Sequence, residues 1–205
     1  DHGHDGEQNH IHRVEPIAWL ERHLAADHFV LGLGIARNID ATDAVAVAFG
    51  NTISDFNEQE ISKKISIRTS LSYLSWNNCT VNVIDTPGTP DFSGEVLATM
   101  NAVGSAVFVV NAESGVEIEM LKIWRKFDKP KLVFINKMDK ENADYEKCLL
   151  NLKENFKEVT FVPLNIPIGS GKNFKGVVDL IDREARYFED NGKKIRKDKA
   201  PDDIT

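Results

Sequence analysis

Two short apolar runs, with an amphipathic segment between them, constrain the fold more than any other feature of this sequence. The first run covers residues 105–110 and the second covers residues 131–135. Strands that are covered on both faces have continuous apolar runs, and such strands are typical of parallel sheets. Between the runs, residues 117–128 place Ile118, Leu121 and Trp124 at helical spacing. A strand, a helix and a second strand in this order predict an α/β fold built from βαβ units.

The neighbouring segments extend this pattern in both directions. Residues 65–76 alternate between apolar and polar side chains, which predicts a half-buried strand. Its apolar face is expected to consist of Ile65, Ile67, Thr69, Leu71 and Tyr73. The remaining expected elements are a turn at Asn77-Asn78, a partner strand over 80–84, a strand over 131–135, and helices over 93–103 and 143–156.

A polar tetrapeptide, Asp85-Thr86-Pro87-Gly88, closes the strand expected over 80–84. In open α/β sheets, ligands bind outside the carboxyl ends of the strands. An aspartate at that position can hold Mg²⁺ directly or through water, and the Gly88 N–H can approach a terminal phosphate because glycine has no Cβ. A plain turn is the alternative interpretation of this motif taken alone.

A second polar tetrapeptide, Asn136-Lys137-Met138-Asp139, closes the strand over 131–135. The Asp139 carboxylate can accept two hydrogen bonds from the N1–H and exocyclic amine of guanine, a pair that adenine lacks, and the Lys137 stem can lie across the base. A helix cap is the alternative for this motif. Two such motifs in order, each directly after an apolar strand, indicate a guanine-nucleotide fold: a P-loop-NTPase-like α/β domain with three layers around a mostly parallel sheet.

The sequence around both motifs resembles the GTPase domain of translation elongation factor G and related translational GTPases. Residues 57–60, followed by 65–67, resemble the end of the first switch of that family, and residues 85–96 resemble its second switch. Residues 163–180 resemble the insert subdomain that elongation factor G carries within its GTPase domain and that Ras-like GTPases lack. The resemblance runs from about Gly50 to Arg186.

The resemblance implies an organisation and a set of ligands. It predicts a GTPase core over 50–162 and the beginning of the insert subdomain over 163–205, which leaves an N-terminal segment of uncertain origin over 1–49. It implies that GTP or GDP binds with Mg²⁺ through the two tetrapeptides, and that Ser66 and Asp85 are the metal-binding residues. It also implies GTP hydrolysis coupled to action on the ribosome, and a cytoplasmic location.

One departure from the family concerns the phosphate-binding loop, because no Gly-Lys-Thr or Gly-Lys-Ser occurs in the chain. If residues 35–41 are aligned with the family's opening loop, its Gly-Lys-Thr falls on Thr42-Asp43-Ala44. An aspartate in place of the lysine would remove a charge-assisted bond of about 1.5–3 kcal/mol and add repulsion of about 4 kcal/mol at roughly 4 Å. Alternatively the alignment is accidental and the loop is missing, with the native N-terminus replaced.

A second departure concerns catalysis. The family's water-orienting histidine falls on Thr89, and no histidine follows His28. Losing positioned acid–base help typically costs about 10²–10⁴ in rate. Some elongation-factor-G-like paralogues also lack this histidine, so nucleotide binding can persist where hydrolysis is slow. A non-catalytic, nucleotide-binding-deficient fragment or chimera is the alternative to a competent GTPase. The family's metal-binding threonine falls on Ser66, which keeps the hydroxyl oxygen.

A change in composition motivates the boundary near residue 49. All six histidines lie within the first 28 residues, whereas every lysine lies at or after Lys63. Residues 1–49 contain eight of the 32 acidic residues and three of the 25 basic residues, so this segment is far more acidic than the rest of the chain. Its histidines could bind a transition metal, although a polar terminal segment is the simpler interpretation.

Composition excludes several other classes of protein. The net charge of −7 argues against dedicated nucleic-acid binding, and no direct DNA binding is expected. The two cysteines do not make a disulfide framework. The sequence contains no apolar run of about 18 residues, so no membrane span is predicted. The basic run Lys193–Lys199 could touch RNA, but a solvated hairpin arm after the turn at 190–192 is the simpler interpretation.

Overall fold

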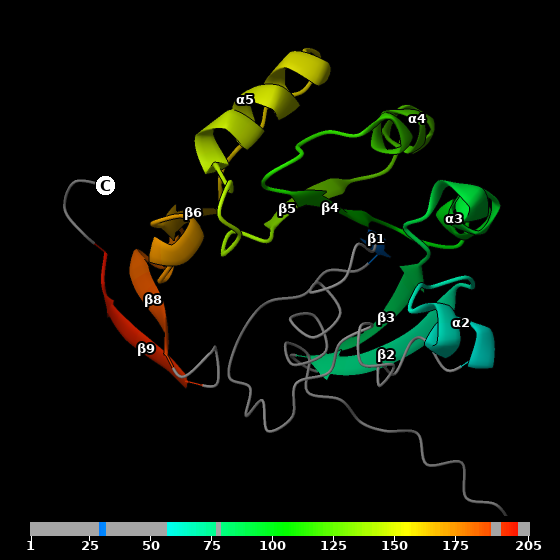
Figure 1. The fold of residues 1–205 in the computed structure, drawn as a ribbon, viewed down its shortest axis with the longest axis horizontal. Helices are drawn as coiled ribbons and strands as arrows, with labels where there is room; N and C mark the ends of the chain where they lie inside the picture. Colours follow the sequence, from blue (N-terminus) through cyan, green and yellow to red (C-terminus); the bar gives the residue numbers. More distant parts are fainter. Residues whose placement is uncertain (1–28, 32–56, 77–78, 190–193, 201–205) are drawn as a thin grey trace, which may run out of the picture.

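A computed structural model of the chain describes residues 29–31, 57–76, 79–189 and 194–200, which form two sheets. The first sheet has five strands in the order β2-β3-β1-β4-β5. The two predicted motifs begin at the carboxyl ends of β3 and β5, which are labelled in Figure 1. The strands are β1 (Phe29–Leu31), β2 (Ser70–Trp76), β3 (Cys79–Thr86), β4 (Ala106–Asn111) and β5 (Lys131–Asn136).

Strands β3, β4 and β5 run in the same direction, which brings their carboxyl ends to one edge of the sheet. β4 and β5 pair in parallel, as the two apolar runs predict. The other pairs are antiparallel, because β2 and β3 form a hairpin and the three-residue β1 runs against both β3 and β4. The prediction of a mostly parallel sheet therefore needs correction, since the sheet is mixed.

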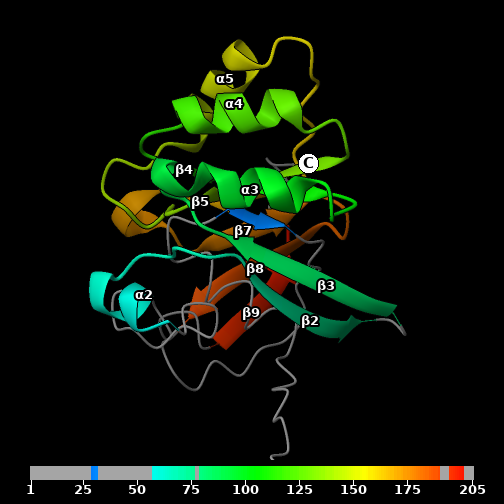
Figure 2. The same ribbon diagram turned by 90° about the vertical axis from the view of Figure 1, so that its right-hand side faces the viewer.

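Three helices cover one face of the first sheet, as Figures 1 and 2 show. They are α3 (Ser93–Met100), α4 (Ile118–Lys126) and α5 (Tyr145–Asn155), so the three predicted helices are confirmed with shorter bounds. A fourth helix, α2 (Glu58–Lys63), was not predicted and precedes β2 in the chain. A helical layer on the opposite face is not among the described residues, so the third layer stays a prediction.

An aromatic cluster fills the space between the helices and the sheet. The rings of Trp124 and Phe156 stack with their centroids 4.3 Å apart, and Phe108 lies 4.9 Å from Trp124. Trp124 and Cys148 are buried, as expected for packing residues. Ile118, in contrast, is 70% exposed, so the predicted apolar face of α4 is wrong at its first residue. α4 begins at Ile118, and its buried side chains are Met120, Ile123 and Trp124.

The predicted apolar face of β2 also needs correction. The strand begins at Ser70, and Leu71 and Tyr73 are 70% and 43% exposed, whereas Ser70 is buried. Leu71 lies opposite Ile84, which packs against the helical core, so both residues face the helices. β2 is nevertheless the edge strand, and it extends beyond α3 (Figure 2). Alternation therefore predicted the strand but not which of its faces is covered.

The second sheet is antiparallel throughout and has the order β6-β7-β8-β9. Its first strand begins close to the boundary predicted at residue 163. Val178, Ala185 and Ala200 form its core. Its strands are β6 (Asn165–Ile168), β7 (Gly176–Asp179), β8 (Glu184–Glu189) and β9 (Lys194–Lys199).

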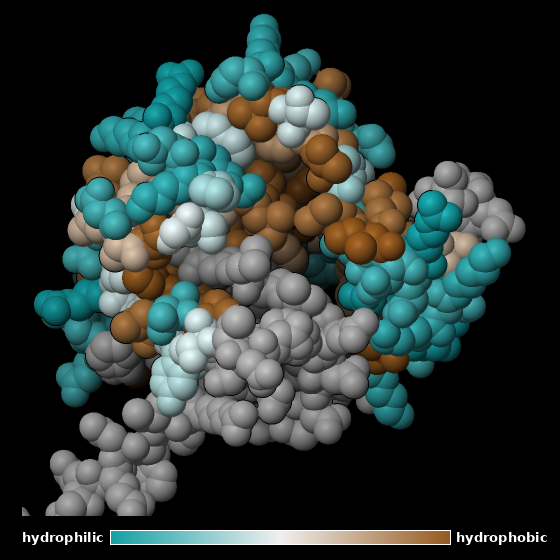
Figure 3. Space-filling model, turned by 180° about the vertical axis from the view of Figure 1, so that it is seen from behind, coloured by the Kyte–Doolittle hydropathy of each residue, from teal (hydrophilic) through white to brown (hydrophobic). Residues whose placement is uncertain are grey.

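The basic run near the C-terminus forms one arm of a hairpin, as predicted. β9 pairs with β8 in antiparallel register, from Glu184↔Lys199 to Glu189↔Lys194. Its charged side chains are exposed, and the hairpin presents a hydrophilic surface at the right of Figure 3. The predicted turn at 190–192 lies outside the described residues.

Candidate functional site

The two polar motifs lie at the same edge of the first sheet but well apart along it. In the strand register, Asp85 is level with Val30, Val107 and Leu132, whereas Asn136 is level with Asn111. Four residues along the strands and three strand spacings separate the Cα atoms of Asp85 and Asn136 by roughly 20 Å. The edge therefore offers two contact regions, one near β3 and one near β5, which we call the phosphate side and the base side.

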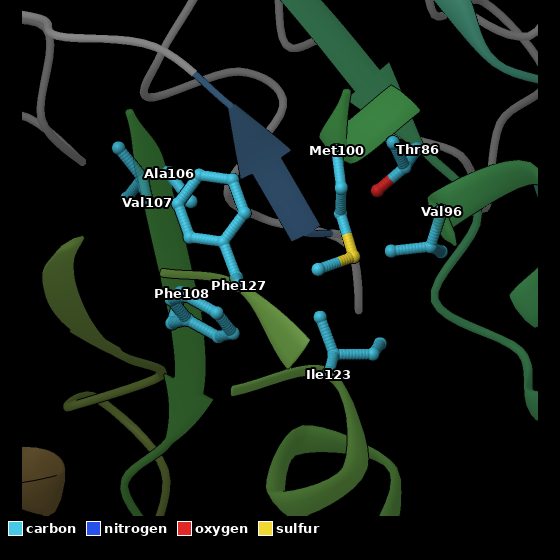
Figure 4. Close-up of a pocket in the computed structure, with 8 residues that line it drawn as sticks. All are labelled: Thr86, Val96, Met100, Ala106, Val107, Phe108, Ile123 and Phe127. Atoms are coloured by element: carbon cyan, nitrogen blue, oxygen red, sulfur yellow. The ribbon is translucent and has the colours of Figure 1, made fainter. Parts of the chain in front are cut away.

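On the phosphate side, Asp85 and Thr86 project to opposite faces of the sheet. Asp85 is 2% exposed at the end of β3. Thr86 is fully buried and lines a small apolar pocket with Val96 and Met100 of α3, as Figure 4 shows. Of the predicted pair, Asp85 therefore points away from the helical core, while the Thr86 side chain belongs to it.

The chain turns sharply after this motif. Pro87 is fully buried and Gly88 is half-buried. Thr89 precedes a short 3-10 helix, η2 (Pro90–Phe92), and its carbonyl accepts a hydrogen bond from the Phe92 N–H at 3.0 Å. Thr89 is itself half-buried, so the position that the resemblance assigns to a catalytic histidine lies next to Gly88 and holds a side chain with no basic group.

A carboxylate that was not predicted as a site residue holds the loop that carries Ser66. Glu60 is 1% exposed, and its oxygens accept hydrogen bonds from the N–H groups of Asn57 at 3.1 Å, Ile67 at 2.9 Å and Arg68 at 2.9 Å. Charge-assisted bonds of this kind are roughly twice as strong as neutral ones. Glu60 thereby fixes the backbone on both sides of the buried Ser66. The Asn57-x-x-Glu60 capping box was the available signal.

A second connection ties this loop to the helix that follows the Asp-Thr-Pro-Gly motif. The Thr69 N–H donates to the Glu95 carboxylate at 3.2 Å, and the Thr69 and Thr99 hydroxyls lie 3.4 Å apart. Thr99 in turn donates to the Glu95 carbonyl at 2.9 Å. The chain directly after the segment that resembles the first switch is therefore in contact with Glu95, within the segment that resembles the second.

The donor set on the phosphate side suits a hard cation. Ser70 lies directly across from Asp85 in the strand register, and its buried hydroxyl makes no hydrogen bond within the described part of the chain. Hydroxyl and carboxylate oxygens are ligands that Mg²⁺ accepts. Among the described residues, no group of three or more His, Cys, Asp or Glu side chains is placed to hold a metal ion. Mg²⁺ held by so few protein groups typically completes its coordination with water and substrate phosphates.

On the base side, the Asn-Lys-Met-Asp motif forms a tight turn directly after β5. Lys137 has a left-handed φ of 61°, and its carbonyl accepts a hydrogen bond from the Lys140 N–H at 3.1 Å. The Asn136 carbonyl accepts from the Ala112 N–H at 2.9 Å, which ties the turn to the end of β4. Met138 is buried, while Asp139 is exposed and Lys137 is partly exposed. The carboxylate is therefore presented outward from a fixed backbone.

Beyond the turn, the chain enters α5 through a second set of local bonds. The Asp144 side chain caps the helix by accepting from the Lys147 N–H at 3.0 Å. One turn later, burial and the nearby Asp144 raise the pKa of the Cys148 thiol to about 11. That thiol is 2% exposed, so Cys148 is a packing residue and takes no part in the site.

Some sequence predictions lie outside the described residues. They include the predicted alignment of residues 35–44 with a phosphate-binding loop and the histidines of the first 28 residues. No helix within the described ranges is long and apolar enough to cross a membrane.

Comparisons with known proteins agree with this geometry. Residues 28–190 match the family described as "Elongation factor Tu GTP binding domain". Residues 28–49 of the predicted N-terminal segment therefore lie within the matched range. The chain is 36% identical over 155 residues to elongation factor G of Mycoplasma pneumoniae and 37% identical over 160 residues to elongation factor G of Gluconobacter oxydans. It is also 36% identical over 150 residues to the mitochondrial ribosome-releasing factor 2 of Anopheles gambiae.

These matches cover most of this chain and a small part of each relative. They span 74%, 76% and 72% of the chain but only 22%, 23% and 20% of the three relatives, respectively. The chain thus spans about a fifth of the length of the curated relatives that it matches. A solved structure from Thermus thermophilus superposes with a TM-score of 0.69 at 24% identity, covering 78% of this chain and 24% of that one, which supports the fold.

Proposed function

Because the chain belongs to the family of elongation factor Tu GTP binding domains, we propose that it is the guanine-nucleotide-binding part of an elongation-factor-G-like translation factor. The observation that carries the proposal is the arrangement of the sheet edge. A buried aspartate ends one strand, and a turn that presents a carboxylate ends another strand at the same edge. A nucleoside di- or triphosphate has its base and its phosphates at opposite ends, and two separated contact regions match that shape.

On the base side, Asp139 is the proposed guanine-reading residue. Its carboxylate is exposed and can accept both hydrogen bonds that guanine offers at N1 and at the exocyclic amine. Asn136 and Lys137 are proposed to contact the base and its neighbouring loops, with the Lys137 stem lying along the ring. Met138 is proposed to act through its backbone, since its side chain is buried in the turn.

On the phosphate side, Asp85 and Ser66 are the proposed Mg²⁺-binding residues. Bound Mg²⁺ would neutralise charge on the phosphate oxygens, and Ser70 is a third oxygen donor within reach of Asp85 in the strand register. The Gly88 N–H is proposed to approach the terminal phosphate. Thr86 and Pro87 support this role by holding the strand end in the core.

Hydrolysis by this chain is proposed to be slow in comparison with relatives that have a histidine after the Asp-Thr-Pro-Gly motif. Thr89 has no group that can orient or deprotonate water at neutral pH, and missing acid–base help typically lowers a rate by about 10²–10⁴.

The ribosome is the proposed partner, because two relatives are named elongation factor G and one is named ribosome-releasing factor 2. The second sheet is proposed to be the beginning of the insert subdomain, and the proposed location is the cytoplasm.

Isothermal titration calorimetry with GDP and GTP in the presence of Mg²⁺ tests the proposal. The expected result is heat with GDP and GTP and none with ADP at the same concentration. Removing Mg²⁺ with a chelator should weaken binding of GTP more than that of GDP, because GTP has one more phosphate for the metal to neutralise. No heat at high micromolar guanine nucleotide would sink the proposal for this chain.

A further inference from the structure

The second sheet reaches across to the base side of the site through one short turn. This turn, which we call the insert turn, consists of the 3-10 helix η3 (Gly171–Asn173) and Phe174. It contacts residues 136–143, the turn that follows β5, which we call the base loop. The Gly171 N–H donates a hydrogen bond to the Met138 carbonyl at 2.8 Å. Met138 directly precedes Asp139, so the contact acts one peptide away from the proposed base-reading carboxylate.

Gly171 fits this contact because it has no side chain. Its φ of +56° lies in the left-handed region, which side chains disfavour. A Cβ at this position would also lie 3.3 Å from the carbonyl oxygens of both Lys140 and Glu141. Such a Cβ would press against two rigid backbone groups of the base loop. The close approach of the two turns therefore depends on glycine.

Phe174 supplies the apolar half of the contact. Its side chain packs against a small cluster of buried residues, Ala112, Met138 and Ala143. Ala112 comes from the end of β4, while Met138 and Ala143 belong to the base loop. The Phe174 ring also lies 6.0 Å from that of Phe188 in β8. The cluster thus connects the first sheet, the base loop and the second sheet.

An ion pair across the same junction contributes less. Lys172 Nζ lies 3.2 Å from the Glu141 carboxylate, but the side chains are 81% and 76% exposed. Solvent screens such pairs, and their contribution to stability is typically small. The buried hydrogen bond at Gly171 and the packing of Phe174 are therefore the contacts that can hold the base loop in place.

We propose that the insert turn is a positioning element for base selection. Asp139 is exposed, so its position depends on the backbone of the base loop. Gly171 and Phe174 contact this loop from the side of the second sheet, and Ala112 contacts it from the first sheet. The inference rests on the proposed function for its consequence, guanine selectivity. The mechanical part, that the insert turn orders the base loop, stands on these contacts alone.

Hydrogen exchange of the whole chain, measured by mass spectrometry without nucleotide, tests the mechanical part. Phe174→Ala should raise the exchange rate of amides in residues 135–146 by about tenfold or more, because local opening controls exchange. Phe174→Leu should restore most of the protection. Val178→Ala is the matched control, since Val178 is fully buried in the same sheet without contacting the base loop. It should raise exchange in β7 and β8 only.

Two results would overturn the mechanical part. Unchanged exchange over 135–146 in a folded Phe174→Ala variant would show that the insert turn does not hold the base loop. An equal rise with Val178→Ala would show that general loosening of the second sheet explains the effect. Gly171→Ala gives a second route to the same answer if Phe174→Ala does not fold.

The consequence for selectivity is measured by titrating GDP and inosine diphosphate, which lacks the exocyclic amine. Phe174→Ala should lower the ratio of the two affinities by about tenfold, whereas Val178→Ala should leave it unchanged. An unchanged ratio in Phe174→Ala, with exchange raised, would overturn the role in base selection. Absence of GDP binding by the unmutated chain would instead refute the proposed function, and the exchange result would still decide whether the insert turn holds the base loop.

Discussion

The base side and the phosphate side of the candidate site differ in how completely the chain builds them. On the base side, the turn after β5 is held by hydrogen bonds from Ala112 and Gly171 and presents Asp139 outward. On the phosphate side, Asp85 and Ser66 are both buried, but the sequence has no Gly-Lys-Thr and has Thr89 where a histidine is expected. The contacts proposed for the base and those proposed for the phosphates therefore depend on different parts of the chain.

The largest expected effect comes from repairing the phosphate side. The triple change Thr42→Gly, Asp43→Lys and Ala44→Thr should tighten GDP binding by roughly three to five powers of ten, since it removes a repulsive carboxylate and adds a charge-assisted bond. Calorimetry measures the gain. Asp40→Lys, which makes the same change of charge nearby, is the control. No gain would mean that residues 42–44 do not correspond to the family's phosphate-binding loop.

The second prediction concerns the packing of α5, the helix that follows the base loop. The pKa of the Cys148 thiol is raised to about 11, chiefly because burial disfavours the thiolate and also because of Asp144. At pH 8 the reactive thiolate should be about a hundredfold scarcer than for a thiol with the ordinary value of 9.0, and burial should slow labelling further. Iodoacetamide labelling followed by peptide mass spectrometry measures the rate in native and urea-unfolded protein. Equal rates in the two states would contradict the packing of α5.

The third prediction concerns the loop on the phosphate side. Glu60→Gln keeps the shape of the side chain but removes the charge that three backbone N–H groups share, which should cost about 1.5–3 kcal/mol locally. Limited proteolysis should then cut residues 57–68 faster while leaving the base loop as resistant as before. Glu58→Gln, at an exposed position of the same helix, is the control. An equal rise in cleavage at residues 57–68 and at the base loop would show that the two loops are not held independently.

The smallest expected effect lies in the second sheet, away from both sides. The pKa of Glu184 is below its ordinary value, chiefly because the Lys197 side chain hydrogen-bonds to it. A carboxylate whose pKa falls on folding stabilises the fold above its ordinary pKa and loses that contribution as the pH falls. Urea unfolding at pH 7 and pH 4 should therefore show a slightly smaller loss at low pH for Glu184→Gln than for the unmutated chain. Glu158→Gln, at an exposed carboxylate outside the second sheet, is the control.

The elements that sequence patterns predicted well are those with a local cause. Continuous apolar runs indicated β4 and β5, and the two motifs lie at the carboxyl ends of β3 and β5, as expected. The exposure of Leu71 was not predictable, because alternation does not say which strand is at the edge. Glu60 was missed because two of the groups it binds lie seven and eight residues away in the chain. The contact of Gly171 with Met138 joins two sheets, and no local pattern reports such a pairing.

The exchange Asp139→Asn tests the central claim most directly. An asparagine amide can donate where the carboxylate could only accept, so it should favour the carbonyl that xanthine has in place of the guanine amine. We predict that xanthosine diphosphate binds the variant better than GDP does, a reversal of the order for the unmutated chain, with each lost bond worth about 1.5–3 kcal/mol. Competition calorimetry with the two nucleotides gives the ratio. An unchanged preference for GDP would contradict the assignment of the turn after β5 as the guanine-reading end of the site.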